Sequence, residues 1–484
     1  MNSIIRNYIY NIVLTLTNIL FPLLVFIYVS RIMGPEALGQ VSFASSVAGY
    51  FVGLASFGIG SYGIREIARV RDNKIKLKEV FNELLLINCY TTIISLLLYF
   101  TFIFINQKTK SEIMLFSING LSIILTLFSF EWLFQGLEKY KYILIRSIFV
   151  KIIAFILIII FVKSRNDYIL YSLLTIIGLG ANNIFNLFYA GKIVEIKIKR
   201  RKVLFHLKGL FKFVLISYVS TFYLLLDKVI LGFISGSYYV GLYAPAEKIV
   251  RLALGLVLSL SAVIFPRISN IYSQGDSKKA ESLISVSMHA ILLLAIPLFI
   301  GIEIIAQPVI NIISGSEYAS SVLTLRIEAF IIIPVSLANI SGTQILIGSG
   351  KEKYYLFALT FGALSFIIAS VILVPIFYQN GTAIAMVIAE VVICFFMFYY
   401  SKKTLVNMFS IKWIIPLVIS SIVMGIVVII MLQINSGLFN VLSSILVGVV
   451  IYSCILYLFK DRVLIMLVSK LNLFIKKIKI DKVQ

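Results

Sequence analysis

The chain consists largely of long apolar stretches, and this pattern restricts its fold more than any other feature. About fourteen runs of roughly twenty mostly apolar residues follow one another, separated by short connections. A helix of that length crosses the hydrocarbon core of a bilayer. The sequence therefore predicts an all-α polytopic membrane protein with about fourteen transmembrane helices.

The predicted spans lie near residues 12–30, 41–62, 84–105, 113–134, 143–162, 168–190, 210–233, 238–264, 283–305, 322–347, 355–377, 381–400, 413–433 and 438–459. None of the connections is long enough for a separate domain outside the membrane. The first run is too long for a cleaved signal peptide and more spans follow it, so we expect it to remain in the protein.

The positive charge of the chain follows the predicted spans. Lysine and arginine number 43 against 21 acidic residues, giving a formal net charge of +22, which in a soluble protein would suggest nucleic-acid binding. Here the basic residues gather in the connections after the even-numbered spans, as the positive-inside rule describes. We expect a multi-pass protein of the plasma membrane with both termini in the cytoplasm. The basic segments 192–212 and 460–482 would lie on anionic lipid or serve as topology anchors.

Several function classes lack the residues that they need. Cys89, Cys394 and Cys454 all fall inside apolar runs, and His206 and His289 are isolated, so we expect no disulfide frame and no metal site. The sequence has no phosphate-binding loop, no H-E-x-x-H and no nucleophile elbow. We expect a transporter with no cofactor rather than an enzyme or an ATP-driven pump, with coupling to Na⁺, H⁺ or the membrane potential left open.

A repeated motif predicts two similar halves. The pattern G-x4-G-x4-A begins at Gly34 and again at Gly236, an offset of 236 − 34 = 202 residues. Each copy falls between the first and second spans of a six-span unit, which indicates a parallel repeat. We predict a six-helix bundle at 1–200, a second at 201–404, two additional helices at 405–460 and a basic amphipathic cytoplasmic tail at 461–484.

The stretch 217–251 carries charges inside two predicted spans: Asp227, Lys228, Glu247, Lys248 and Arg251. Each charge costs roughly 2.5–3.5 kcal/mol at the bilayer centre on insertion scales, so such residues persist where they meet a partner or a watery cavity. One interpretation is an ion pair within a single helix, between Glu247 and Arg251 one turn later. A polar cavity through which a substrate passes is the other.

Other spans carry polar faces. Asn18 is the last of several polar residues that lie on one side of the first span. In the second span, a stripe of small residues around Gly49 predicts close helix packing. The asparagines at 182, 183 and 186 and the polar group around Gln344 are compatible with hydrogen bonds between helices and equally with a wet cavity.

Five segments together resemble one family. They are SRIMGPEALGQVSFASS, FGIGSYGIREIARVRD, LDKVILGFISGSYYVGLYAPAEKI, FPRIS and QILIGSGKEKYY, in order over about residues 1–400. This set is similar to the polysaccharide-export branch of the multidrug/oligosaccharidyl-lipid/polysaccharide exporter superfamily, the Wzx-type flippases of lipid-linked oligosaccharides. The two extra spans resemble the fourteen-span members.

The resemblance implies two six-helix bundles around a central cavity that works by alternating access. The implied substrate is an undecaprenyl-diphosphate-linked oligosaccharide repeat unit, moved from the inner to the outer leaflet of a bacterial plasma membrane for capsule, O-antigen or another surface polysaccharide. Arg31, Lys248 and Arg251 match its cavity cations, with Asp227 and Glu247 as partners or coupling sites. Cations, arginine above all, suit a diphosphate because charge-assisted hydrogen bonds are strong at low dielectric. Polymerase and export proteins are implied partners of a monomer.

Three alternatives stay open. A drug/cation antiporter of the same superfamily would favour a cavity dominated by carboxylates, and a dye-transport assay separates it. A lipid II flippase would use the same mechanism on another sugar. A repeat-unit polymerase or ligase would need a large outer loop, which this sequence lacks.

Overall fold

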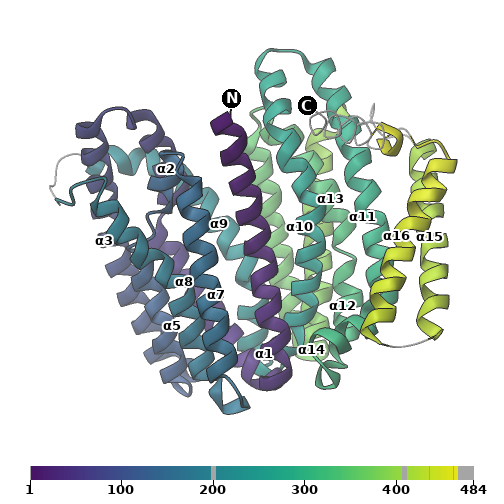
Figure 1. Cartoon of the computed structure of the whole chain (residues 1–484), viewed down its shortest axis with the longest axis horizontal. Coiled ribbons are helices and arrows are strands. Elements are labelled where there is room, and N and C mark those ends of the chain that lie inside the picture. The colour runs from purple at the N-terminus through teal and green to yellow at the C-terminus, as the bar shows by residue number, and fades with distance from the viewer. Residues whose placement is uncertain (1, 198–202, 406–410, 435–436, 462, 467–484) are drawn as a thin grey trace, which may run out of the picture. The chain divides into compact units, whose positions relative to one another are not determined.

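The computed structural model describes residues 2–197, 203–405, 411–434, 437–461 and 463–466, and these residues form helices and turns without strands (Figure 1). Their contacts divide the chain into two compact units, Met1–Ala244 and Pro245–Gln484. The bundle boundaries expected from the sequence stay predictions, and most of the expected tail at 461–484 lies outside the described residues.

The first unit holds ten elements and the beginning of an eleventh. They are α1 (Asn2–Ser56), α2 (Ile59–Val70), α3 (Lys74–Ile105), α4 (Gln107–Lys110), α5 (Ile113–Thr126), α6 (Glu131–Gly136), α7 (Tyr140–Phe161), the 3-10 helix η1 (Arg165–Asp167), α8 (Tyr168–Gly191), α9 (Val203–Ile234) and the first turns of α10 (Ser237–Ser273).

The second unit continues α10 and, in its described part, adds six α-helices, one 3-10 helix and one π-helix. They are α11 (Ser277–Ile313), η2 (Ser316–Tyr318), α12 (Ser321–Ala329), α13 (Ile332–Asn339), the π-helix η3 (Ile340–Ile347), α14 (Glu352–Leu405), α15 (Ile411–Ile434) and α16 (Leu438–Leu458). Of these α-helices, α10 is shared with the first unit.

The predicted membrane spans are confirmed as helical segments. Eleven helices of the described chain are long and apolar enough to cross a bilayer. Two of the helices, α1 and α14, run through a kink, at Gly34 (φ 70°) and Tyr378 (φ 50°). The helix α14 therefore contains two predicted spans, and α1 contains the first predicted span and most of the second. The predicted span 210–233 lies within α9. The fold class predicted from the sequence, an all-α membrane protein, is thus confirmed.

Three predicted spans are broken rather than continuous. The span 41–62 is interrupted between α1 and α2 at Phe57 (φ 45°) and Gly58 (φ 67°). The span 322–347 divides into α12, α13 and the π-helix because Pro334 has no N–H to donate to the carbonyl of Phe330, four residues earlier. The span 113–134 divides into α5 and α6, and Asn88 of α3 donates to the carbonyls of Thr126 and Leu127 at 3.1 and 3.4 Å where the helix ends.

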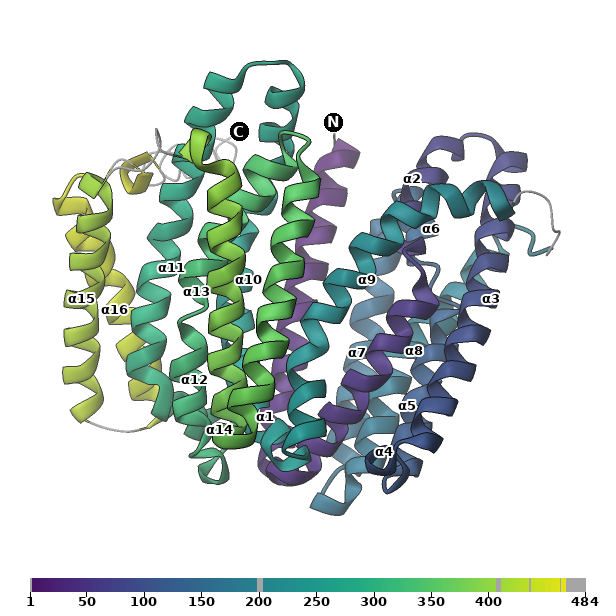
Figure 2. The same ribbon diagram turned by 180° about the vertical axis from the view of Figure 1, so that it is seen from behind.

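In the first unit, α1 packs against α3, α5, α7, α8 and α9. The predicted role of its small residues is confirmed at two positions. A Cβ atom added to Gly49 would lie 2.6 Å from Leu225 of α9, and one added to Gly53 would lie 3.2 Å from Thr221. Figure 2 shows α2 and α4 at opposite ends of this unit, so the basic connections that adjoin them are separated by the length of the helices.

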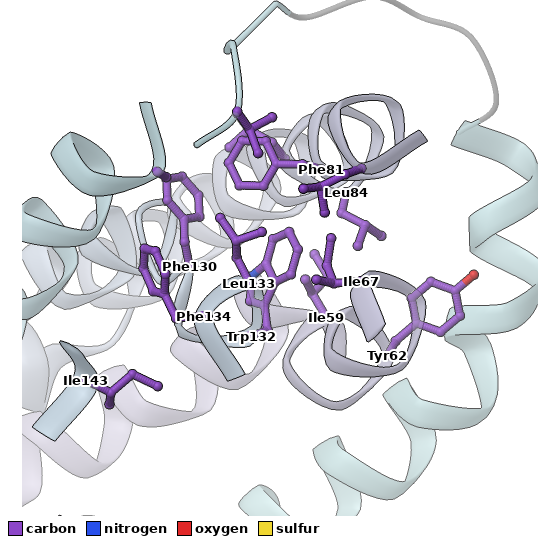
Figure 3. Packing of buried hydrophobic residues seen from close by; sticks show 14 of the residues in the cluster. Ile59, Tyr62, Ile67, Phe81, Leu84, Phe130, Trp132, Leu133, Phe134 and Ile143 are labelled. Atoms are coloured by element: carbon purple, nitrogen blue, oxygen red, sulfur yellow. The ribbon is translucent and has the colours of Figure 1, made fainter. Parts of the chain in front are cut away.

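An aromatic cluster fixes α2 beside α3 and α6 (Figure 3). Phe81 stacks on Trp132 with ring centroids 5.6 Å apart, and Phe130 meets Phe81 edge to face at 5.1 Å. Ile67 of α2 is fully buried against them. Each side chain contributes roughly 1.5–3 kcal/mol by burial, so this end of the unit is firmly packed.

Next to the cluster, His206 of α9 bridges two other helices. Its Nδ1 lies 2.9 Å from the Tyr62 hydroxyl of α2, and its Nε2 lies 2.9 Å from Glu83 of α3. All three side chains are buried. The histidine therefore joins α9 to α2 and α3.

The connection after α8 is held to α3. Asn82 donates to the carbonyl of Glu195 at 3.0 Å and accepts from the N–H of Lys197 at 2.8 Å. The Glu195 carboxylate also pairs with Lys78 and Lys197. Hydrogen bonds from Lys197 and Lys78 lower the pKa of Glu195 to about 2. Residues 198–202 of the predicted basic segment lie outside the described chain, and its last part forms the start of α9.

In the second unit, His289 joins α11 to the two C-terminal helices. Its ring stacks on Trp413 of α15 at 4.6 Å and 9°, and its Nε2 lies 2.7 Å from Asp461, which follows α16. Burial alone would raise the pKa of Asp461, but hydrogen bonds from His289 and from the N–H groups of Leu464 and Val463 bring it below its ordinary value.

The repeated glycines meet each other. A Cβ atom added to Gly39 would lie 2.7 Å from the nitrogen of Gly241 and 2.8 Å from the carbonyl carbon of Ser237. One added to Gly241 would lie 2.6 Å from the carbonyl carbon of Pro35. Adding 202 to 35 and 39 gives 237 and 241, so the contact is reciprocal. Both positions need glycine because the two backbones touch.

Candidate functional site

The predicted site residues divide between the two units. Asp227 and Lys228 lie on α9 in the first unit, and Glu247, Lys248 and Arg251 lie on α10 in the second. Whether they share a cavity stays a prediction. Each group can be described within its own unit.

Asp227 is completely buried and tied to its surroundings by hydrogen bonds. One carboxylate oxygen accepts from the backbone N–H of Lys228 at 2.7 Å, and the other accepts from the hydroxyl of Tyr243 on α10 at 3.2 Å. The sequence predicts that Asp227 needs a partner on another helix, and Tyr243 is such a partner. Lys228 is half-buried.

Glu247 and Arg251 form the intrahelical pair that the sequence left open as one interpretation. Arg251 Nε lies 2.7 Å from Glu247 Oε1, and the side chain of Glu247 is buried whereas that of Arg251 is 37% exposed. An exposed pair of this spacing contributes only about 0.3–0.5 kcal/mol. The roles of Arg251 and of the half-buried Lys248 toward a substrate stay predictions.

The remaining two candidates lie on α1. Arg31 is exposed and stands three residues before the kink at Gly34. Asn18 is also exposed, and its side-chain oxygen accepts a hydrogen bond from Lys151 of α7. Asn18 therefore contacts a buried cation, Lys151, that was not predicted as a site residue.

Two buried cations of α7 were not predicted as site residues. Lys151 lies at the middle of this 22-residue helix and is 9% exposed, and Arg146 is 7% exposed. They are five residues apart, about 7.5 Å along the helix axis. The sequence contains one sign of this site: Lys151 stands at the centre of an otherwise apolar run, where a charge is costly without a partner.

Asparagines hold these cations. Arg146 Nε donates to Asn182 Oδ1 of α8 at 3.1 Å, while Lys151 binds Asn18 of α1. Neither cation is neutralised by its asparagine, because an amide carries no charge. The pair of helices α1 and α8 therefore keeps two positive charges within the membrane-spanning part of the first unit.

Some of the other polar residues that the sequence left open make hydrogen bonds between helices, whereas the side-chain amide of Asn186 is buried without a hydrogen-bond partner in the described structure. Asn183 donates to the carbonyl of Leu125 in α5 at 2.9 Å. In the second unit, the Gln344 amide donates to Ser261 of α10 at 2.9 Å and to Ser287 of α11 at 2.8 Å. These contacts favour packing over a wet cavity at both places.

In the part of the chain that the structure describes, no three histidine, cysteine, aspartate or glutamate side chains lie together as they would around a metal ion. The first unit buries the cations Arg146 and Lys151.

Comparison with known proteins decides the family. Residues 4–272, more than half of the 484, match the family described as polysaccharide biosynthesis protein. The chain belongs to this family. The resemblance predicted from the sequence is thereby confirmed, and the matched region contains Asn18, Arg146 and Lys151.

Relatives of the family cover most of the chain. A protein of Escherichia coli strain K12 named for O-antigen transport is 26% identical over 412 residues, which is 84% of this chain and 98% of that protein. One of Shigella dysenteriae with the same name is 26% identical over 383 residues, 78% of this chain and 95% of its own length.

The fold is also found in solved structures. The lipid II flippase MurJ in an inward closed conformation aligns with a TM-score of 0.74 at 18% identity, covering 93% of this chain and 98% of its own. An inward-facing multidrug resistance transporter of the MATE family aligns with a TM-score of 0.66 at 16% identity, covering 80% and 94%. At these identities the likeness concerns the fold.

Proposed function

We propose that the protein is a flippase that moves undecaprenyl-diphosphate-linked oligosaccharide repeat units from the inner to the outer leaflet of a bacterial plasma membrane by alternating access. The observation that carries this proposal is the pair of buried cations, Arg146 and Lys151, in a span of the family's matched region. Relatives named for O-antigen transport support the substrate class.

The diphosphate headgroup is the part of the substrate that is hardest to move through the membrane. A diphosphate that leaves water for the membrane loses hydration worth many kcal/mol, and a nearby cation offsets that loss because Coulomb attraction grows as the dielectric falls. Lys151 lies at the depth where the loss is greatest, and its hydrogen-bond partner Asn18 is exposed. The prenyl tail needs no polar partner and can stay in lipid while the headgroup crosses.

Deletion of the gene tests this function directly. Lipid-linked repeat units should accumulate on the inner leaflet and surface polysaccharide should be lost, and the wild-type gene should restore both. Normal export and no accumulation in the deletion strain would refute the proposal. Accumulation of lipid II instead would assign the protein to cell-wall synthesis, and efflux of a cationic dye would indicate a drug transporter.

Lys151→Gln tests the site with a matched control. Glutamine retains a donor for Asn18 but removes the charge, so we expect export to fall at least tenfold at normal membrane abundance. Lys163→Gln removes a cation just beyond the end of the same helix, at an exposed position, and should export normally. Equal export by both variants would remove Lys151 from the proposed path.

A further inference from the structure

A pocket of about 510 Å³ lies on the first unit where α7 begins and α8 ends. Three of the residues that line it are cations, Lys139, Lys141 and Arg146, and none of its eight lining residues is acidic. Four others are aromatic: Tyr142, Phe149, Phe185 and Tyr189. The volume falls within the range of small-ligand sites.

Arg146 is the buried cation among the residues that line this pocket. Its Nε is bonded to Asn182, but its Nη1 is buried and has no hydrogen-bond partner in the described structure. A buried guanidinium nitrogen left without an acceptor costs more than an ordinary unmade hydrogen bond. The guanidinium nevertheless lines the pocket, and its positive charge attracts an anionic group there.

The aromatic residues form a rigid wall beside the cations. Tyr142 and Tyr189 stack with ring centroids 4.1 Å apart, Lys139 lies 5.0 Å from the Tyr189 ring, and Arg146 lies 5.4 Å from the Tyr142 ring. The Tyr142 hydroxyl donates to the carbonyl of Phe185 at 3.0 Å, which fixes α7 to α8. The wall is therefore set before any ligand arrives.

The rest of the pocket is apolar and uncovered. Phe149 is 56% exposed and Phe185 45% exposed, in helices that otherwise face hydrocarbon. A ligand that fits both parts has an anionic head and an apolar chain. By the positive-inside rule, Lys139 and Lys141 lie at the cytoplasmic boundary, where such a lipid has its headgroup.

Charge favours a diphosphate over an ordinary phospholipid. Of the acids close in sequence, Glu131 of α6 interacts electrostatically with Arg146, and Glu138 is paired with Arg71. About two net positive charges remain, which match the two charges of a diphosphate diester better than the single charge of a phosphodiester.

We propose that this pocket receives the diphosphate headgroup of a polyprenyl-linked lipid from the cytoplasmic leaflet before the headgroup crosses the membrane. This inference rests on the proposed function and adds an entry site to it. Arg146 and Lys139 bind the phosphates, Phe149 and Phe185 hold the first part of the prenyl chain, and Lys151 lies about 7.5 Å deeper along the same helix.

The test is a binding measurement on the full chain in nanodiscs of zwitterionic lipid. Undecaprenyl diphosphate and phosphatidylglycerol are titrated separately, and bound lipid is counted by native mass spectrometry. We expect the diphosphate to bind at least tenfold more tightly than phosphatidylglycerol. Arg146→Gln should weaken diphosphate binding about ten- to hundredfold, as expected for loss of a charge-assisted hydrogen bond.

Two further variants keep the test decisive. Lys139→Gln alters a half-buried position and should weaken binding even if Arg146→Gln fails to accumulate. Lys163→Gln, at the other end of α7, should bind like the wild type. Wild-type affinity in both pocket variants, or equal affinity for the two lipids, would overturn the assignment.

Failure of this inference can be told apart from failure of the proposed function. A pocket variant with full diphosphate binding would refute the entry site while export by the wild type still stood. A deletion strain that exports normally would refute the flippase, and the nanodisc titration would still decide whether the pocket binds a diphosphate lipid.

Discussion

Replacing Gly39 by alanine should impair export without removing the protein from the membrane. The added Cβ atom would lie 2.7 Å from the nitrogen of Gly241 and 2.8 Å from the carbonyl carbon of Ser237, where ordinary contact begins at 3.4 Å. The two backbones must therefore part by more than 0.7 Å (3.4 − 2.7), because the carbonyl oxygen of Ser237 would lie closer still. Rigid backbone on both sides leaves no flexible side chain to absorb that shift.

Overpacking of this kind costs typically 1–3 kcal/mol. The cost falls on conformations that keep the contact, so their population should drop about 5- to 150-fold relative to conformations that lack it. A transporter that alternates between two states through this contact would lose most of its turnover. We expect at least fivefold less surface polysaccharide at unchanged membrane abundance.

The assay compares surface polysaccharide with the amount of protein in the membrane fraction. Gly241→Ala should reproduce the defect, and the double variant should add little because both changes act on one contact. Gly60→Ala is the control, since an added Cβ there meets nothing within 4 Å. Normal export by both Gly39→Ala and Gly241→Ala would refute the reasoning.

Other substitutions test the remaining groups. Arg251→Ala and Lys248→Ala should abolish export while the protein stays abundant in the membrane; wild-type export would remove both from the cavity. Asp227→Asn should reduce transport more than thermal stability, measured on the purified protein, and an unfolded product would indicate a purely structural residue. The pKa of Glu195 is lowered to about 2, so its ion pairs should hold above pH 4.5 and be lost as the pH falls through about 2. In the wild type, proteolysis after residue 197 should therefore rise only near pH 2. In Glu195→Gln, which lacks the charge, it should be fast already at pH 7. Asp461→Asn should lower the thermal stability of the purified protein, and an unchanged melting temperature would contradict the bridge to α11.

Sequence reasoning predicted the fold well because apolar length is a strong signal. Each expected span is found in a helical segment, since a run of about twenty apolar residues has few alternatives to a membrane helix. The breaks at Pro334 and after Thr126 were not predicted. The break after Thr126 depends on where its hydrogen-bond partner Asn88 lies, which only the packed helices determine, whereas Pro334 is a helix breaker that the sequence already contains.

The candidate site was predicted less completely. Charges that cluster, such as Glu247 and Arg251, attract notice in a sequence, whereas a single lysine inside an apolar run is easily passed over. Lys151 is hydrogen-bonded to Asn18 and Arg146 to Asn182, which lie 133 and 36 residues away along the chain. No periodicity within one helix encodes such a pairing.

The reciprocal contact at the two repeated glycines has the form of an interface between identical subunits. Gly39 faces Ser237 as Gly241 faces Pro35, so the surface matches a copy of itself after a shift of 202 residues. In a two-fold symmetric dimer one mutation alters the interface twice, but after duplication within one gene each side changes alone. Substitutions at these four positions should therefore be tolerated in matched pairs more readily than one at a time.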